Sequence, residues 1–261
     1  MFIDTHMHIG YDFGIEPDKY IENANSKNVG LMIASFCEKT DLTLSTEFVD
    51  KYDCLYACVG YHPENANDIV EEDYKKLEDT IKSNKKIVAI GEIGLDYYWN
   101  KDNKDVQKSV FRRQLELAEK LNLPVVIHTR DAIEDTYQIL KEYKVKGVMH
   151  CFNGSIEMAK KFIDLGFLLG IGGVLTFKNC KLYQVIEQID LSNIVLETDS
   201  PYLAPEPVRG TTNESANIPY IAERIANIKN TSIDEVMKTT TNNACLLFDL
   251  DINMWYYLIR K

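Results

Sequence analysis

The sequence lacks the cysteine spacing of a structural zinc site or of a disulfide framework. No CxxC pair occurs, and the cysteines lie in strand-like and helix-like segments, as small apolar residues do. They are Cys37, Cys54, Cys58, Cys151, Cys180 and Cys245. We therefore expect no disulfides. Cys151 draws attention only because it follows a candidate metal ligand, and a buried packing role is the alternative.

Long apolar runs and basic leader segments are also missing. The chain is 45% hydrophobic, yet it has no uninterrupted run of about 18 apolar residues that would suggest a membrane span. The first residues, MFIDTHMHIG, have neither the basic start nor the apolar stretch of a signal peptide. We expect a cytoplasmic protein without membrane association. No strong linker divides the sequence, so we expect one domain, residues 1–261.

An excess of positive charge is absent, because the formal net charge is −11. This balance argues against the broad basic surface that gives strong non-specific binding of nucleic acid. It leaves local phosphate binding open, since divalent cations in an acidic site reverse the field where they bind.

What the sequence does contain is a regular alternation of two patterns. Apolar, β-rich runs recur at residues 2–9, 29–36, 55–61, 87–95, 124–129, 147–152, 167–177 and 194–198. Amphipathic helical patterns lie between or after them, at residues 68–82, 106–121, 132–143, 156–165, 218–228 and 233–247, with Ser232 as the expected N-cap of the last. The alternation predicts an α/β fold, a single-domain (β/α)8 TIM barrel of the metal-dependent hydrolase type. An open doubly wound sheet is the alternative, but it would not bring the ends of eight strands around one point.

Residues 201–219 do not fit this alternation and are rich in Pro, Asn and Thr. We expect a long loop after the last strand, on the face where barrel enzymes keep their active sites. Arg209 and Asn213 in this loop could contact substrate, and a plain connecting role is the alternative for each.

All five histidines stand close to the end of an apolar run: His6, His8, His62, His128 and His150. Glu92 and Asp199 occupy the same kind of position. A single histidine at a strand end is more often structural than catalytic. Five histidines together with two carboxylates indicate a metal-centred active site.

The number of these groups indicates two metal ions. His6 and His8 are two residues apart on one strand, so both side chains point to the same side, the barrel interior. Four imidazoles and two carboxylates exceed the ligands of one tetrahedral catalytic ion, so we infer two neighbouring divalent ions, with Glu92 as the natural bridge. Such ions lower the pKa of bound water and stabilise attacking and leaving oxygens. Asp199 could bind one ion and also accept the proton of the attacking water.

Arg130 lies two residues beyond His128 and therefore points to the same side. Its planar guanidinium suits phosphate oxygens, which favours phosphoester hydrolysis. A salt bridge at the barrel rim is the alternative. His62, held in a rigid turn by the following proline, could donate to the same phosphate or orient a ligand.

Six motifs carry a family resemblance. In chain order they are FIDTHMHIG, VGYHPEN, IGEIGLDYYW, VVIHTRDA, MHCFNG and ETDSPYLAP. They resemble those of the TatD family of metal-dependent deoxyribonucleases, within the wider amidohydrolase-like barrels. The resemblance runs from residue 2 to the NNACLLF segment near residue 248.

The resemblance implies a barrel that binds two divalent cations and hydrolyses phosphodiester bonds, often as an exonuclease from a 3′ end. The implied ligands are His6, His8, Glu92 and Asp199 for one ion, and Glu92, His128 and His150 for the second. It also places His62 and Arg130 near the substrate, and the RGTTN segment that starts at Arg209 resembles the family's loop after the final strand. Glu64 stands where some members carry a second histidine.

Three functional hypotheses remain open. The first is a nuclease that acts on single-stranded DNA ends, because a narrow barrel mouth favours chain ends over duplex interiors. Tyr97, Tyr98 and Trp99 could then stack on bases, with packing as their alternative role. The second is a binuclear hydrolase of a small amide, ester or phosphoester. Glu92 stands where many amidohydrolases use a modified lysine, which favours the nuclease.

The third hypothesis is a non-catalytic, metal-stabilised binding protein, against which the complete ligand set argues. The metal stays open among Mg²⁺, Mn²⁺ and Zn²⁺, because imidazole favours zinc whereas phosphoryl chemistry commonly uses the other two. The expected partner is DNA, with no membrane and no obligate protein partner.

Overall fold

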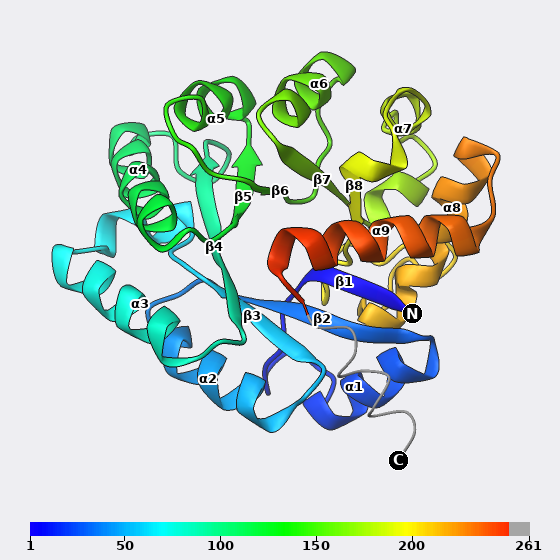
Figure 1. The fold of residues 1–261 in the computed structure, drawn as a ribbon, viewed down its shortest axis with the longest axis horizontal. Helices are drawn as coiled ribbons and strands as arrows, with labels where there is room; N and C mark the ends of the chain where they lie inside the picture. The colour runs from blue at the N-terminus through cyan, green and yellow to red at the C-terminus, as the bar shows by residue number, and fades with distance from the viewer. Residues whose placement is uncertain (251–261) are drawn as a thin grey trace.

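A computed structural model shows eight strands in one sheet, and it describes residues 1–250. The strands are β1 (Phe2–Met7), β2 (Val29–Phe36), β3 (Leu55–Val59), β4 (Ile87–Asp96), β5 (Val125–Arg130), β6 (Gly147–Met149), β7 (Phe167–Ile171) and β8 (Ile194–Leu196). They lie in sequence order, and each neighbouring pair from β1 to β8 is parallel. Figure 1 shows them curled into a nearly closed barrel with helices outside. The predicted (β/α)8 barrel is confirmed.

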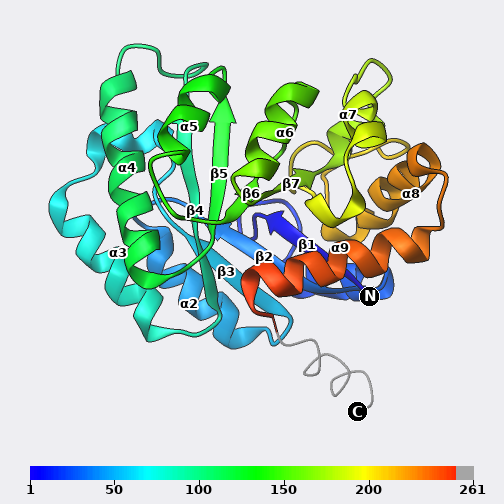
Figure 2. The same cartoon turned by 45° about the horizontal axis from the view of Figure 1, so that its top comes forward.

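Helices fill the connections and cover the barrel. They are α1 (Pro17–Ser26), α2 (Asp41–Lys51), α3 (Glu71–Ser83), α4 (Lys104–Leu121), α5 (Ile133–Leu140), α6 (Ile156–Asp164), α7 (Tyr183–Gln188), α8 (Ile218–Lys229) and α9 (Ile233–Phe248). Short 3-10 helices follow some strands and loops: η1 (Pro63–Asp68), η2 (Gly173–Thr176), η3 (Leu191–Asn193) and η4 (Ser215–Asn217). The last helix, α9, packs against β1 and β8, and Figure 2 shows it beside β1.

The strands are apolar because both of their faces are covered. Every residue of β2 is buried, as is every residue of β4, which explains why these strands read as continuous hydrophobic runs rather than as alternating ones. The helices instead bury one stripe. In α4, for example, Phe111, Leu115 and Ala118 are buried against the barrel, and the opposite face carries charge.

The structure corrects several boundaries. The run predicted as a strand at 167–177 ends at Ile171, because Gly173–Thr176 turns into the 3-10 helix η2. Glu92 lies within β4 rather than at its end, since this strand continues to Asp96. The Ser232 hydroxyl accepts a hydrogen bond from Glu235 N at 3.1 Å, which confirms the predicted N-cap.

The seam between β1 and β8 is closed without a regular ladder. The amide nitrogen of Asp199 donates to the His6 carbonyl oxygen at 2.9 Å, and the Thr5 hydroxyl donates to the Leu196 carbonyl oxygen at 3.1 Å. Farther along, His8 N donates to Ser200 O at 2.8 Å. These bonds hold His6 at the end of β1, and His8 just after it, beside Asp199, which follows β8.

Gly94 allows β4 and β5 to approach each other closely. Its φ is +145°, and a Cβ built there would lie 1.9 Å from the carbonyl oxygen of His128. Only glycine tolerates both conditions without strain. The close approach sets Glu92 and Asp96 of β4 beside His128 and Arg130 of β5.

Among residues 1–250, no helix is long and apolar enough to cross a membrane. The domain predicted for residues 1–261 also includes 251–261, which lie outside the described residues.

Candidate metal centre

The predicted ligands meet in a cavity of about 1000 Å³ at the carboxyl ends of the strands. Five of the predicted metal ligands line it, as do His62 and Arg130: the five are His8, Glu92, His128, His150 and Asp199. His6 lies beneath them, 1% exposed. The barrel thus gathers residues that are up to 193 positions apart in the sequence.

His6, His8 and Glu92 have the spacing of ligands around an ion, and Asp199 lies close to both of these histidines. The His6 Nε2 atom lies 3.5 Å from Glu92 Oε2 and 3.7 Å from Asp199 Oδ1, and His8 Nε2 lies 3.5 Å from the same Asp199 oxygen. Ligand atoms about 2.1 Å from one tetrahedral ion lie about 3.4 Å apart. The observed distances are long for hydrogen bonds and suit a shared divalent cation.

The chemistry of His6 also fits a cation. Neither of its buried nitrogens has a hydrogen-bond partner in the structure, although buried polar groups are normally paired. Burial and the neighbouring His150 lower the pKa of His6, so the ring is neutral and its Nε2 can offer a lone pair. Zinc or a similar divalent ion is bound by such a lone pair.

His128 makes two hydrogen bonds to carboxylates. Its Nδ1 lies 2.8 Å from Glu92 Oε1, and its Nε2 lies 3.0 Å from Asp96 Oδ2. Burial disfavours the charged ring, but these two bonds outweigh burial and raise the pKa of His128 to about 9. His62 Nε2 lies 3.9 Å from the same Glu92 oxygen, so the structure groups His62, Glu92 and His128 as a second possible metal site.

His150 stands between the two groups. Its Nε2 lies 3.7 Å from Glu92 Oε1 and 3.6 Å from Asp199 Oδ1, while its Nδ1 lies 3.1 Å from Glu197 Oε1. Burial opposes a positive charge there, but Glu197, Glu92 and Asp199 together raise the pKa of His150 to about 10. The structure groups His150 with His6 and Asp199, whereas the resemblance assigns it to the second ion with Glu92 and His128. The division of the ligands between two ions stays a prediction.

The predicted substrate residues are not all at the cavity. Arg130 lines it, and its guanidinium lies 3.9 Å from the ring centre of Tyr98 and 5.4 Å from that of Trp99. Arg209 is not among the lining residues. Its guanidinium lies over Phe177, 3.8 Å from the ring centre, so its role in substrate binding stays a prediction.

Two other residues considered for substrate contact are buried and make hydrogen bonds within the fold. Asn213 is fully buried and bridges the carbonyl oxygens of Thr198 and Tyr202. Tyr97 is buried, and its hydroxyl donates to Asp135 Oδ2 at 2.7 Å. The neighbouring Tyr98 and Trp99 are exposed, at 49% and 64%, and remain free to meet a substrate.

Sequence reasoning did not assign a role to two buried carboxylates beside the cluster, Asp96 and Glu197. Both lie within the quoted motifs, IGEIGLDYYW and ETDSPYLAP. A signal was present for Asp96, because it is four residues after Glu92 on the same strand, and even spacing on a strand places side chains on one side. Glu197 lies beyond the end of β8, so only its closeness to Asp199 in the sequence could have indicated it. Three aromatic residues that also line the cavity, Tyr11, Phe13 and Tyr202, gave no such signal.

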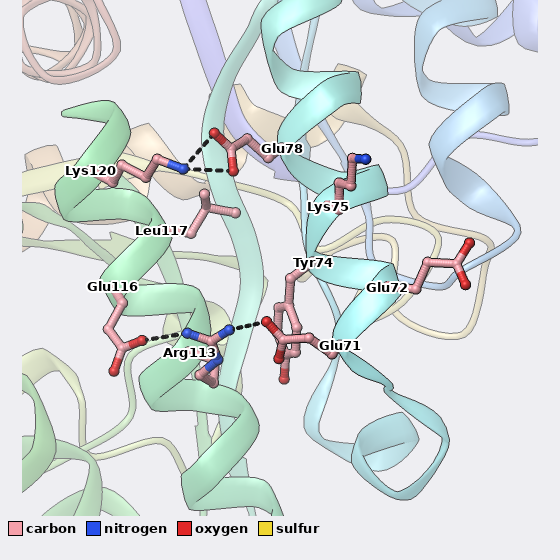
Figure 3. Close-up of a pocket in the computed structure, with 9 residues that line it drawn as sticks. All are labelled: Glu71, Glu72, Tyr74, Lys75, Glu78, Arg113, Glu116, Leu117 and Lys120. Atoms are coloured by element: carbon pink, nitrogen blue, oxygen red, sulfur yellow. Dashed lines mark hydrogen bonds and ion pairs between the residues drawn. The ribbon is translucent and has the colours of Figure 1, made fainter.

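A second hollow lies on the outside of the barrel between α3 and α4 (Figure 3). Its charged groups pair with one another: Lys120 contacts Glu78 at 2.7 Å, and Arg113 contacts Glu116 at 2.9 Å and also Glu71. Paired surface charges of this kind contribute little energy and leave few groups to receive a ligand. The barrel cavity, with its buried and unpaired histidine nitrogens, is therefore the candidate site.

Comparison with known proteins agrees with this geometry. The chain is 42% identical to the uncharacterized metal-dependent hydrolase YabD of Bacillus subtilis, over 96% of this chain and 100% of that protein. It is 35% identical to the uncharacterized metal-dependent hydrolase YcfH of Escherichia coli K12, over 95% and 96% of the two chains. The crystal structure of YjjV, a TatD homologue from E. coli K12, superposes with a TM-score of 0.89 at 28% identity and covers 96% of this chain and 98% of that one.

The family match extends over almost all of the described residues. Residues 3–249 match the family described as TatD related DNase, which includes all the predicted metal ligands. The chain therefore belongs to the TatD family of metal-dependent hydrolases.

Proposed function

We propose that this protein is a deoxyribonuclease that hydrolyses phosphodiester bonds at the ends of single-stranded DNA. One observation carries the proposal: Arg130, in contact with the exposed rings of Tyr98 and Trp99, stands on the wall of the cavity that holds the metal ligands. A guanidinium suits a phosphate, and exposed aromatic rings suit unpaired bases. A nucleic acid strand offers both groups at once.

The ligand cluster would hold the divalent cations that this chemistry requires. His6, His8, Glu92 and Asp199 would bind one, and Glu92 would share a second with the neighbouring histidines. When bound, such cations polarise the phosphate and make a water molecule more acidic. The remaining work falls to the side chains of the protein.

Asp199 is the proposed general base. Burial alone would raise its pKa, but His150, His8 and His6 lower the pKa below the ordinary value of an aspartate. The group is therefore a carboxylate at neutral pH and can accept a proton. It lines the cavity and is within reach of a water molecule there.

His62 is placed to donate a hydrogen bond to the substrate. Burial lowers its pKa to about 4, so the ring is neutral. Its Nδ1 accepts a hydrogen bond from Glu64 N at 3.3 Å, which leaves the proton on Nε2. Because His62 and Arg130 both line the cavity, a phosphate between them would receive donors from the loop after β3 and from the end of β5.

The test is the degradation of a short single-stranded DNA by metal-stripped protein, with Mg²⁺, Mn²⁺ or Zn²⁺ restored separately. Oligonucleotides labelled at the 5′ or at the 3′ end show the direction of shortening. Asp199→Asn is the control, because it keeps the size of the side chain and removes its negative charge. We expect shortening from one end that depends on the metal and is absent in the variant.

Two results would count against the proposal. Equal shortening by Asp199→Asn would point to a contaminating nuclease. Binding of cations by the wild-type protein without cleavage of any oligonucleotide would refute the nuclease activity. Cleavage of a small phosphoester under those same conditions would then identify a different substrate for the same site.

A further inference from the structure

Asp96 is a buried residue at the end of β4, with an exposed fraction of 1%. Residues that do not line the cavity hold it in place. The buried Gln107 of α4 clamps its backbone: Asp96 N donates to Gln107 Oε1 at 2.8 Å, and Gln107 Nε2 donates to Asp96 O at 2.9 Å. The same amide group also donates to Asn103 Oδ1 at 2.8 Å. The carboxylate therefore projects from a rigid support.

One oxygen of Asp96 determines how His128 faces the metal centre. Asp96 Oδ2 lies 3.0 Å from His128 Nε2, and a carboxylate accepts hydrogen bonds but cannot donate one. The bond thus keeps a proton on Nε2. The other ring nitrogen, Nδ1, lies 2.8 Å from Glu92 Oε1 and can donate to it when no cation is bound. A cation held beside Glu92 would displace the Nδ1 proton, and the bond to Asp96 would keep the proton on Nε2.

The other oxygen orders the cavity rim. Asp96 Oδ1 accepts hydrogen bonds from the backbone nitrogens of Tyr98 at 2.8 Å and Trp99 at 3.0 Å. These are the exposed rings that contact Arg130, which faces Asp96 across the β4–β5 pair. Tyr97 N also donates to Arg130 O at 2.9 Å. A single carboxylate therefore touches both the candidate metal ligand and the turn that carries the aromatic rim.

We propose that Asp96 is a positioning residue that fixes the tautomer of His128 for cation binding and holds the Tyr98–Trp99 turn at the cavity rim. That this turn receives the substrate rests on the proposed function. The hold on His128 and on the turn does not depend on which substrate is bound.

The discriminating variant is Asp96→Asn. Its carbonyl oxygen can still accept from the two backbone nitrogens, whereas its amide group donates toward His128 Nε2. The ring would then carry its proton on Nδ1 and could not offer a lone pair to a cation there. Loss of such outer-shell partners typically weakens metal binding about 10–100-fold. Asp96→Ala should lose the hold on the turn as well.

Calorimetric titration of metal-stripped protein with Zn²⁺ or Mn²⁺ measures the first effect, and His128→Ala identifies the binding step that uses this histidine. We expect Asp96→Asn to weaken that step about 10–100-fold. Asp102→Asn, the same change at an exposed aspartate in the following loop, should leave it unchanged. Wild-type affinity in Asp96→Asn, or no step that depends on His128, would overturn the proposal.

Two measurements by NMR make the test independent of activity, and the first of them, made on the wild-type protein, is also independent of how the variants fold. In the zinc-loaded wild-type protein, the side-chain nitrogen signals of His128 should show the proton on Nε2, and a proton on Nδ1 would contradict us. Amide exchange at Tyr98 and Trp99 should quicken in Asp96→Ala and stay slow in Asp96→Asn. Unchanged exchange in Asp96→Ala would refute the hold on the turn. None of these readouts contains DNA, so a failure of the nuclease proposal leaves them unaffected.

Discussion

Replacing Asn213 by alanine should destabilise the protein strongly, although Asn213 lies in a loop. Its side-chain nitrogen donates to Thr198 O at 2.9 Å and to Tyr202 O at 2.6 Å. Its side-chain oxygen accepts from Glu214 N at 3.0 Å and from Asn217 Nδ2 at 2.9 Å. The truncated variant would lose all of these bonds at a fully buried position.

The expected loss follows from which partners water can reach. A net hydrogen bond is worth about 0.5–1.5 kcal/mol, and a buried group left unpaired costs more, about 1–3 kcal/mol. Thr198 is fully buried, so its carbonyl oxygen stays unpaired in the variant, whereas Glu214 and Asn217 are partly exposed and can turn to water. We expect about 2–4 kcal/mol in the free energy of unfolding. For a chain of this length, the melting temperature should fall by roughly 5–15 °C.

The matched control is Asn217→Ala, which removes only the bond to Asn213 from a partly exposed position. It should cost no more than about 1 kcal/mol. Thermal melts of the three proteins, followed by circular dichroism in the same buffer, measure the difference. If the melting temperature of Asn213→Ala equalled that of Asn217→Ala, the argument from buried hydrogen bonds would be wrong. A raised KM with an unchanged melting temperature would instead restore the substrate contact considered from the sequence.

Three further predictions concern the metal centre and the barrel. Glu92→Ala and Asp199→Asn should each abolish oligonucleotide cleavage, whereas Arg130→Ala should mainly raise KM. Cleavage at the wild-type rate by Glu92→Ala or by Asp199→Asn would refute the two-ion mechanism. Removal of divalent cations with a chelator should lower the melting temperature, and their restoration should reverse the change, because a cation at about 100 times its Kd adds about 2.7 kcal/mol to the free energy of unfolding. If the melting curves with and without chelator coincide, tight cation binding is excluded. Gly94→Ala should lower the free energy of unfolding by more than the roughly 1 kcal/mol expected of Gly166→Ala, because the added Cβ would lie 1.9 Å from a carbonyl oxygen at Gly94 and would meet nothing within 4 Å at Gly166. Equal denaturation midpoints of the two variants in urea would contradict the close approach of β4 and β5.

The sequence predicted the strands better than the helices, for a physical reason. A strand such as β2 is buried on both faces, so its apolar run is visible without knowledge of the fold. Helices α1 and α2 each bury only a few apolar side chains among many polar ones, and α7 has six residues. Such weak or short stripes do not distinguish a helix from a loop, and these three helices were not predicted.

For the candidate site, likewise, some features could be predicted from the sequence and others could not. Ligand types and their order along the chain identified the cluster, because histidines and acids at successive strand ends of a barrel must converge. The partners of each ring nitrogen could not be predicted, since they depend on ring orientation. His128 faces Glu92 through Nδ1, whereas His150 faces it through Nε2. The roles of Asp96 and Glu197 follow from those orientations.

The hydrogen bonds that close the barrel also set the geometry of the metal centre. The seam between β1 and β8 is joined by Thr198 N and Asp199 N, which both donate to His6 O. Beneath it, the buried Asp4 accepts from Thr198 and from the Ser215 hydroxyl at 2.6 Å. Strand β1, which carries His6 and leads directly to His8, is thereby tied to the loop that carries Asp199. A substitution that opens this seam must separate candidate ligands on its two sides, so it should lower the free energy of unfolding and the cation affinity together. A substitution on the outer face of a helix should change the free energy of unfolding independently of the cation affinity.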